Sequence, residues 1–200
     1  MPDKAELKQL LQERNEHPER STEIDQHIRS RFEQDCAILV LDLSGFSRLT
    51  IRHGIIHFLA LVHRMTTIAT PIVDRNTGRV VKQEADNLFA VFPEVEAAVK
   101  TAAEILQAFE AVNTGLPDDQ DLYASIGVGF GKTLVIGQTD LFGSEMNLAC
   151  KLGEDLARRG EILLTEAAFK RLSKPEEWTA IELSISGLDL TAYTQGGRIL

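Results

Sequence analysis

Two aspartates stand beside predicted strands and have the chemistry to bind a cation together. The first, Asp42, follows six apolar residues in a row, residues 36–41, and such a run is typical of a strand that is covered on both faces. Ser44 and Gly45 come shortly after it and indicate a turn. Asp42 therefore lies where the strand leaves the core. There it is either a turn residue only or part of a site, and a second carboxylate nearby would favour the site.

The second carboxylate is Asp86. Residues 78–92 show two strand-type runs joined by a tight polar turn at Glu84 and Ala85, and Asp86 starts the second run. In a βαββαβ chain the third strand lies between the first two and is antiparallel to both, so the end of the first strand and the start of the third share one edge of the sheet. Asp42 and Asp86 are thus expected to meet. Two such carboxylates repel each other, and oxygen ligands on a rigid frame suit a hard divalent ion such as Mg²⁺.

The composition fits one domain with one core, since 44% of the 200 residues are hydrophobic. The net charge of −9 argues against a nucleic acid or an anionic membrane as the main partner. The N-terminus lacks the apolar core of a signal peptide, and no apolar run approaches the roughly 18 residues of a membrane span. The sequence therefore predicts a cytoplasmic protein. Cys36 and Cys150 fit no disulfide framework or metal spacing and are interpreted as small core residues.

Residues 1–34 are predicted to form a helical segment ahead of the main domain, which then covers residues 35–200. A break is expected at Pro18, and a second helix is expected to start at Thr22, with Asp25 completing its cap. Because a mostly polar helix needs something to pack on, two interpretations remain open. The segment is either an exposed arm or a coupling element that packs on a partner subunit and modulates activity without providing ligands.

The next helix is predicted from apolar residues at helical spacing between residues 55 and 69, with an end expected near Pro71. His53 and His57 are four residues apart, a spacing that metal-binding histidines also use. Gly54 interrupts the pair, and no carboxylate or cysteine accompanies it in the sequence, so the pattern favours ordinary structural histidines over metal ligands.

The second half is predicted to contain a helix from Pro93 to about residue 114 and a strand from residue 122, followed by a glycine-rich stretch at residues 127–131. Lys132 and Thr133 follow these glycines but lead into a strand-like return and not a helix, so the stretch does not match a phosphate-binding loop. The glycines are interpreted as sites of close strand packing or a bulge.

A further helix is predicted to run to about Ala157 and to place Asn147 and Lys151 on one face. On that face they either contact solvent or bind one ligand. The rest of the chain is predicted as a short strand, a short helix and a closing hairpin, at residues 160–164, 166–172 and 179–193.

Several of these features recur together in the right order, and in this the chain resembles the catalytic domain of the class III nucleotide cyclases, the adenylate and guanylate cyclases. The resemblance runs from about Cys36 to Leu172. It rests on three spaced motifs. The first is Asp42 with Ser44, Gly45 and Phe46, and the second is Lys82 four residues before Asp86. The third is Asp140 seven residues before Asn147, with the cation Lys151 four residues after Asn147.

The resemblance implies an α/β (α+β) fold, a ferredoxin-like βαββαβ core with extra C-terminal helices and a hairpin, preceded by the N-terminal helices. It also implies a head-to-tail homodimer that binds ATP at the subunit interface, with two Mg²⁺ or Mn²⁺ ions per site. Asp42 and Asp86 match the metal aspartates, and Leu43 would add a backbone carbonyl. Gly45 and Phe46 adjoin the first aspartate and are assigned to substrate binding.

The remaining matches concern the base and the ribose. Lys82 and Asp140 match the pair that reads adenine, and Asn147 matches the asparagine that orients the ribose in the transition state. Lys151 occupies the place of the transition-state arginine, whose planar fork a lysine does not reproduce. The assigned reaction is the conversion of ATP to 3′,5′-cyclic AMP and pyrophosphate, and the lysine predicts a slow enzyme rather than an inactive one.

The chain also departs from the family pattern at other positions. Ser186 and Leu188 flank Gly187, where the family carries its triphosphate-binding lysine, and Ala85 replaces the glycine before the second metal aspartate. Many members carry a long segment here, called the tongue, that contacts the second subunit. Residues 137–140 are too few to form it, and in this the chain resembles the subgroup with a short tongue. Lys151, Ser186 and Leu188 all weaken the grip on the triphosphate and support an alternative. This alternative is a catalytically degenerate cyclase-homology domain that binds nucleotide and acts as a regulatory or dimerisation module.

Overall fold

The computed structural model of the protein describes residues 3–185 and 187–195. The helices are α1 (Lys4–Glu16), α2 (Ser21–Phe32), α3 (Phe46–His53), α4 (Ile55–Arg75), α5 (Val95–Asn113), α6 (Ser144–Cys150) and α7 (Glu166–Phe169), with the short turns η1 (Pro18–Arg20), η2 (Asp118–Gln120), η3 (Lys151–Leu156) and η4 (Pro175–Glu177). The strands are β1 (Glu33–Leu43), β2 (Arg79–Glu84), β3 (Asn87–Phe92), β4 (Ala124–Ile136), β5 (Asp140–Phe142), β6 (Ile162–Thr165), β7 (Trp178–Ile185) and β8 (Leu188–Gln195).

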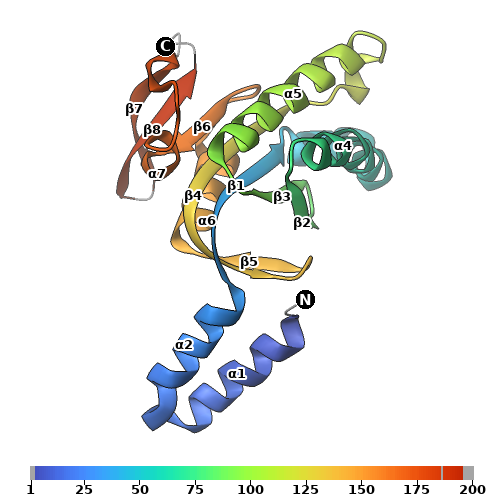
Figure 1. Ribbon diagram of the computed structural model, residues 1–200. Helices are drawn as coiled ribbons and strands as arrows, with labels where there is room; N and C mark the ends of the chain where they lie inside the picture. The colour runs from blue at the N-terminus through green and yellow to red at the C-terminus, as the bar shows by residue number, and fades with distance from the viewer. Residues whose placement is uncertain (1–2, 186, 196–200) are drawn as a thin grey trace.

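The strands form one mixed sheet in the order β2-β3-β1-β4-β6-β8-β7, and β5 pairs with β4 beside this path (Figure 1). β3 lies between β1 and β2 and is antiparallel to both, which confirms the predicted βαββαβ core. The closing hairpin is also present, with Gly187 in the left-handed region at φ +79°.

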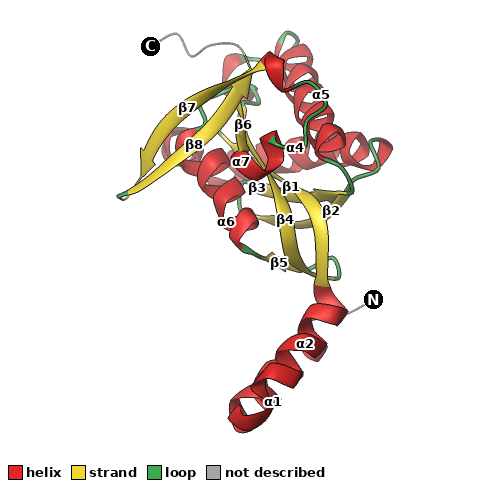
Figure 2. Cartoon of the chain, turned by 60° about the vertical axis from the view of Figure 1, so that its left-hand side comes forward, coloured by secondary structure: helices red, strands yellow, loops and turns green. Residues whose placement is uncertain are grey.

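Helices cover both faces of the sheet, as the apolar run in β1 predicted. Alternate residues of β1 enter two cores: Leu39 and Leu41 pack with α4 and α5, whereas Ile38 and Val40 pack with α6. Because side chains of a strand point alternately to opposite faces, this alternation fixes which helices lie on which side (Figure 2). It leaves Asp42 at the end of a strand that is held from both sides.

The helix α4 continues through Pro71 to Arg75, so the expected end at Pro71 was wrong. Proline removes one helical hydrogen bond, but Ala69, Ile72 and Val73 are buried in the main core, and this packing holds the last turn. α4 is also the one helix of the described residues that is long and apolar enough to cross a membrane by length and composition. Its buried positions pack on the sheet as part of the main core.

The glycine-rich stretch lies inside one continuous strand, β4, and not between a strand and its return. A Cβ on Gly127 would lie 2.0 Å from the carbonyl oxygen of Ala149, and one on Gly129 would lie 2.8 Å from that of Glu145. Side chains here would therefore push α6 off the sheet. The close packing predicted for these glycines is confirmed, and its partner is the helix that carries Asn147.

The N-terminal helices α1 and α2 form a hairpin that projects from the rest of the molecule (Figures 1 and 2). Its apolar residues pack with Ile136 at the end of β4. The second helix starts at Ser21 without a side-chain cap, so the cap expected from Thr22 and Asp25 was wrong. Asp25 instead forms an ion pair with Arg14 of α1 at 2.5 Å, which joins the two helices of the hairpin.

Candidate active site

The structure brings Asp42 and Asp86 to one edge of the sheet. Asp42 pairs with Asn87 in the β1–β3 register, and the backbone N–H of Leu43 donates to the carbonyl oxygen of Asp86 over 3.2 Å. The turn between β2 and β3 therefore holds Asp86 directly against the end of β1. The Leu43 side chain is buried, with 2% of its surface exposed, so this residue has only its backbone to offer at the edge.

Several negative charges lie close together at this edge. Burial raises the pKa of Asp42 to about 7, and the negative charges of Asp86, Glu154 and Asp155 add to the shift. Burial also raises the pKa of Asp86. Among the side chains that the structure describes, which leave out those of residues 46–49, no basic group forms an ion pair with either aspartate. The described side chains thus provide no compensating positive charge for these carboxylates.

The donor set of the edge fits a hard divalent cation. Besides the two carboxylates, it includes the buried side-chain oxygen of Asn87, which has no hydrogen-bond partner within the described chain. Buried polar atoms normally find a partner, and Asn87 stands opposite Asp42 on the neighbouring strand. An all-oxygen set of this kind suits Mg²⁺ or Mn²⁺.

The turn before Asp86 carries backbone strain. Ala85 has φ +51°, a region that residues with a Cβ avoid. Gly45, at φ +97°, adopts a comparable conformation without that cost, and α3 begins directly after it. The side chain of Phe46, predicted to contact substrate, lies outside the described part of the structure.

Lys82 and Asp140 form an ion pair with 3.1 Å between the ammonium nitrogen and a carboxylate oxygen, and both side chains are mostly buried, with 18% and 15% of their surfaces exposed. The Lys82 ammonium also binds Glu84 at 2.8 Å and lies 4.7 Å from the centre of the Phe89 ring. Burial alone would raise the pKa of Asp140, but the hydrogen bond and charge of Lys82 hold it below its usual value. The structure thus joins two residues that are 58 positions apart and presents them together.

An N-terminal residue reaches the same pair. The ammonium group of Lys4, in the first turn of α1, lies 3.4 Å from the second carboxylate oxygen of Asp140. Nothing in the sequence signals this contact, because it depends on how the helical hairpin folds back beside β5. The N-terminal segment and the predicted base-reading residues are therefore physically connected.

Asn147 and Lys151 lie on one face of the helix that crosses β4. The backbone N–H of Lys151 donates to the carbonyl oxygen of Asn147, and the helix changes from α to π geometry at Lys151. Asn147 is exposed and Lys151 half-buried. Neither contacts Asp42 or Asp86 among the contacts of the described residues, and the charges that act on Asp42 do not include Lys151. Within one chain, no contact of the described residues thus links Asn147 or Lys151 to the aspartate edge.

Sequence reasoning missed the acidic residues of η3. Glu154 and Asp155 follow Lys151 in the π-helical turn, and their charges act on Asp42. Glu154 also acts on Cys150, and burial together with this charge raises the pKa of the Cys150 thiol to about 12. Cys150 is therefore an unreactive packing residue, as interpreted from the sequence. The two acidic residues had no sequence signal, since acids on a helix are ordinarily solvated.

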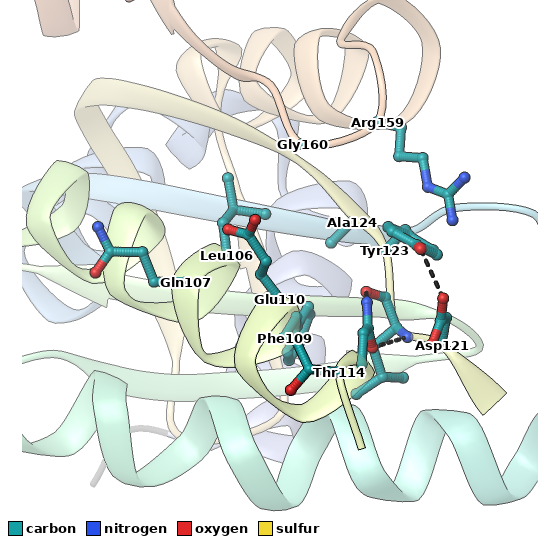
Figure 3. Close-up of a pocket in the computed structure, with 12 residues that line it drawn as sticks. Leu106, Gln107, Phe109, Glu110, Thr114, Asp121, Tyr123, Ala124, Arg159 and Gly160 are labelled. Carbon is teal, nitrogen blue, oxygen red and sulfur yellow. Dashed lines mark hydrogen bonds between the residues drawn. The ribbon is translucent and has the colours of Figure 1, made fainter. Parts of the chain in front are cut away.

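A cavity of about 620 Å³ opens between α5 and the start of β4 (Figure 3). Arg159 lies over the ring of Tyr123 at its mouth, and the Tyr123 hydroxyl donates to Asp121 over 2.6 Å. None of the residues assigned to the site from the sequence lines this cavity.

Comparison with known families identifies this arrangement. The model of the adenylate and guanylate cyclase catalytic domain matches residues 28–189 of the chain. The chain belongs to this family. Class III cyclase domains generally use divalent metal ions, bind nucleotide and act as dimers, so the oxygen-rich edge and the exposed Asn147 are set in a nucleotide cyclase domain.

Two curated relatives are adenylate cyclases by name. "Putative adenylate cyclase 3" of Rhizobium meliloti (strain 1021) is 33% identical over 130 residues, which are 65% of this chain and 22% of that protein. "Adenylate cyclase" of Streptomyces coelicolor is 30% identical over 146 residues, 73% of this chain and 36% of that protein. The cyclase chain therefore matches only about a fifth to a third of the length of these relatives.

Solved structures share the fold. A bacterial light-regulated adenylyl cyclase superposes with a TM-score of 0.69 at 23% identity, covering 82% of this chain and 52% of that one. An adenylate/guanylate cyclase/hydrolase from Silicibacter pomeroyi gives 0.66 at 24% identity, with 82% and 96% covered. The guanylyl cyclase Cya2 gives 0.70 at 16% identity, with 82% and 93% covered. At these identities the likeness shows the cyclase fold alone.

Proposed function

We propose that this domain is an adenylate cyclase that converts ATP slowly to 3′,5′-cyclic AMP and pyrophosphate in a head-to-tail homodimer in the cytoplasm. The observation that carries the proposal is the edge at Asp42 and Asp86, where two carboxylates converge without a positive partner among the described side chains. Mg²⁺ or Mn²⁺ ions held by Asp42, Asp86 and the Leu43 carbonyl would acidify the ribose 3′-hydroxyl and neutralise the leaving phosphates.

The reaction requires no protein nucleophile. The 3′-hydroxyl oxygen bonds to the α-phosphorus, the bond from that phosphorus to the oxygen bridging to the β-phosphate breaks, and pyrophosphate leaves with the electron pair while the hydroxyl proton passes to solvent. Asn147 orients the ribose, and Lys151 offsets the negative charge on the phosphoryl oxygens. Loss of one ideally placed donor typically costs about 10²–10³ in rate, so a lysine in place of an arginine predicts slow turnover.

The adenine assignment rests on Lys82 and Asp140. Their ion pair presents a donor beside an acceptor, which complements the ring nitrogen and the exocyclic amino group of adenine. Both named relatives are adenylate cyclases, which supports the same substrate. Guanine also offers an acceptor beside a donor at this edge, so the experiment must compare the two nucleotides.

The test is incubation of the chain with ATP or GTP and Mn²⁺, with cyclic product identified by mass spectrometry. We expect cyclic AMP as the main product and none from Asp42→Ala. The matched control is Asp35→Ala, an exposed aspartate on the same strand, which should retain activity. Cyclic GMP as the main product would contradict the substrate, and equal rates for Asp42→Ala and the unaltered chain would contradict the site.

The homodimer proposal is supported by the separation of Asp42 and Asp86 from Asn147 and Lys151 within one chain. In a head-to-tail pair, each aspartate pair would meet the Asn147 of the second copy. Mixing inactive Asp42→Ala with inactive Asn147→Ala should then restore about a quarter of the normal activity, because about half of the dimers are mixed and each has one intact site. A mixture that stays inactive although the chains exchange would show that each site uses a single chain.

A second candidate function follows from Lys151, Ser186 and Leu188. Ser186 and the side chain of Leu188 lie outside the described structure, so the argument for them rests on residue type alone. All three weaken the grip on a triphosphate, which favours a domain that binds nucleotide without converting it and signals by rearranging the dimer. Calorimetric ATP binding without any cyclic product in Mn²⁺ would support this candidate, and measurable turnover would exclude it.

A further inference from the structure

A second group of metal-binding side chains lies away from the aspartate edge. His53 ends α3, His57 lies in the first turn of α4, and Asp119 belongs to η2 before β4. One potential ligand atom from each lies within 4.8 Å of the others. His53 Nδ1 is 3.9 Å from an Asp119 carboxylate oxygen, and the ring centres of the two histidines are 4.8 Å apart. The carboxylate that the local sequence lacks is thus supplied by a residue 62 positions after His57.

The backbone explains why these residues meet. Gly54 separates α3 from α4 at φ +87°, a conformation that glycine adopts without strain, so the two histidines sit on either side of a helix break. Arg64, two turns further along α4, donates to the backbone and side-chain oxygens of Gln120 at 3.1 Å and 3.2 Å. α4 therefore holds η2, and with it Asp119, beside its own first turn.

The hydrogen bonding also prepares His57 for a metal. Its Nε2 lies 2.7 Å from the backbone carbonyl oxygen of Asp119. Since a carbonyl only accepts, this nitrogen bears the proton and the other ring nitrogen retains its lone pair. A metal-binding histidine ordinarily donates its second N–H to a carboxylate or a backbone carbonyl, which fixes the tautomer and the ring orientation. This bond is of that kind.

We propose that His53, His57 and Asp119 form a binding site for a transition-metal dication such as Zn²⁺, separate from the oxygen site at Asp42 and Asp86. Two imidazoles and one carboxylate are donors that Zn²⁺ prefers, whereas Mg²⁺ prefers oxygen alone. With bonds of about 2.0–2.2 Å, a tetrahedral ion needs donors roughly 3.4 Å apart. The present separations of up to 4.8 Å therefore require the side chains to close by up to about 1.4 Å, with water in the fourth position.

The location connects this site to the strand that carries Asp42. The chain leaving η2 passes Tyr123, whose carbonyl oxygen accepts the backbone N–H of Ser44 over 2.7 Å. Ser44 lies two residues after Asp42, and α3 leads from there to His53. A bound metal would join α3, the first turn of α4 and η2, so it should raise the melting temperature of the chain.

The test is titration of the purified chain with Co²⁺, whose visible absorption reports nitrogen ligands and low coordination number, followed by displacement with Zn²⁺. We expect one Co²⁺ per chain bound through these ligands and at least a tenfold loss of affinity in His57→Ala and in Asp119→Asn. The matched control is His63→Ala, an exposed histidine on the same helix, which should bind as the unaltered chain does. Asp42→Asn should also keep this band, while millimolar Mg²⁺ should not displace it.

The variants replace partly exposed side chains, and circular dichroism would check that each remains folded. Unchanged Co²⁺ affinity in His57→Ala and Asp119→Asn would overturn the proposal, and so would equal weakening by His63→Ala. The absence of any nitrogen-ligand band up to millimolar Co²⁺ would show that the three residues form only a hydrogen-bonded contact. The result is independent of cyclase activity, since the readout requires no nucleotide.

Discussion

Two groups of charged residues on this sheet differ in how their charges are compensated. At the aspartate edge, Asp42 and Asp86 are brought together with further negative charge nearby and no ion-pair partner among the described side chains. At the base-reading corner, Lys82 and Asp140 neutralise each other at 3.1 Å. The first group is therefore costly for the isolated chain, whereas the second is already assembled.

The difference shows which part of the proposed site depends on a ligand. The carboxylates of Asp42 and Asp86 repel each other, and a bound divalent cation would remove this repulsion. Metal binding should therefore stabilise the folded chain. The paired corner gains little from an ion, and its proposed role is to recognise a neutral base. Four changes test this contrast, beginning with the largest expected effect.

Asp42→Asn should abolish most activity and stabilise the metal-free chain. Removing a metal-binding carboxylate is expected to lower turnover by at least about 10²-fold, on the scale of losing one transition-state electrostatic contact. The same change removes a half-buried charge, and allowing for solvent screening we expect a gain of about 1 kcal/mol in the free energy of unfolding. Mass spectrometry of the product and thermal unfolding measured without metal check the two effects.

The pH dependence gives the sign of the stability effect. The pKa of Asp42 is raised from 3.8 to about 7 in the folded chain. The folded chain therefore holds the proton more tightly than the unfolded chain, and the ionised carboxylate destabilises the fold. The advantage of Asp42→Asn should therefore be absent below pH 4, grow as the pH rises and level off above about pH 7. Asp35→Asn, on the exposed part of β1, should show no such growth. A constant difference at all pH values would contradict the origin in charge.

Lys151→Arg should raise turnover, with a gain approaching tenfold if about 1.4 kcal/mol of transition-state stabilisation returns with the planar fork. Lys151→Ala should lower kcat with less effect on ATP affinity, because a transition-state contact appears mainly in the rate constant. Steady-state kinetics check both, and Lys170→Arg, an exposed lysine paired with Glu166 at 2.7 Å, is the control. Equal rates for all Lys151 variants would remove this residue from the site.

Ala85→Gly should stabilise the chain by about 0.5 kcal/mol. The left-handed conformation costs a residue with a Cβ about 1–2 kcal/mol, and Ala85→Gly removes this cost. Part of the gain in stability is lost because glycine makes the unfolded chain more flexible. Thr77, at φ 64°, is the matched position away from the aspartates, and Thr77→Gly should stabilise as well. Chemical denaturation measures both, and a clear loss of stability in Ala85→Gly would mean that the turn is not strained.

Periodicity and apolar runs were sufficient to predict the core and the meeting of Asp42 and Asp86. The apolar run before Asp42 predicted a strand covered on both faces, and the hairpin at Ala85 predicted the order of the strands. This topology was enough to predict that the two carboxylates lie together. The same local logic was wrong at Pro71, where burial of Ile72 and Val73 outweighs the missing hydrogen bond. Local signals thus predict an element well and its end poorly when packing decides the end.

Contacts between distant segments could not be predicted. Asp119 lies beside His53 and His57 because hydrogen bonds from Arg64 and His57 hold η2 against α4, and no spacing rule connects residues that far apart. The π-helical turn that brings Glu154 toward Asp42 was equally hidden, since it arises from how α6 packs on the glycines of β4. The roles assigned to the site residues stay predictions, to be tested by the kinetics above.

Lys4→Ala is expected to have the smallest effect and tests whether the N-terminal helices act on the base-reading corner. Lys4 binds the Asp140 oxygen that Lys82 does not hold, at 3.4 Å, and its side chain is 54% exposed. An exposed pair of this kind contributes at most about 0.5 kcal/mol. Its loss frees one Asp140 oxygen to accept from the base, so KM for ATP should fall by up to about twofold while kcat stays unchanged.

The salt dependence separates this contact from a general effect of the helix. Surface charges are screened as ionic strength rises, so the difference between Lys4→Ala and the unaltered chain should be largest at low salt and vanish near 0.5 M. Lys8→Ala, one turn further along α1 and exposed, should match the unaltered chain throughout. If KM stays the same at low salt in Lys4→Ala, the helical hairpin does not act on the corner through this ion pair. Its apolar packing on Ile136 and Leu134 then remains as a connection to the cyclase domain.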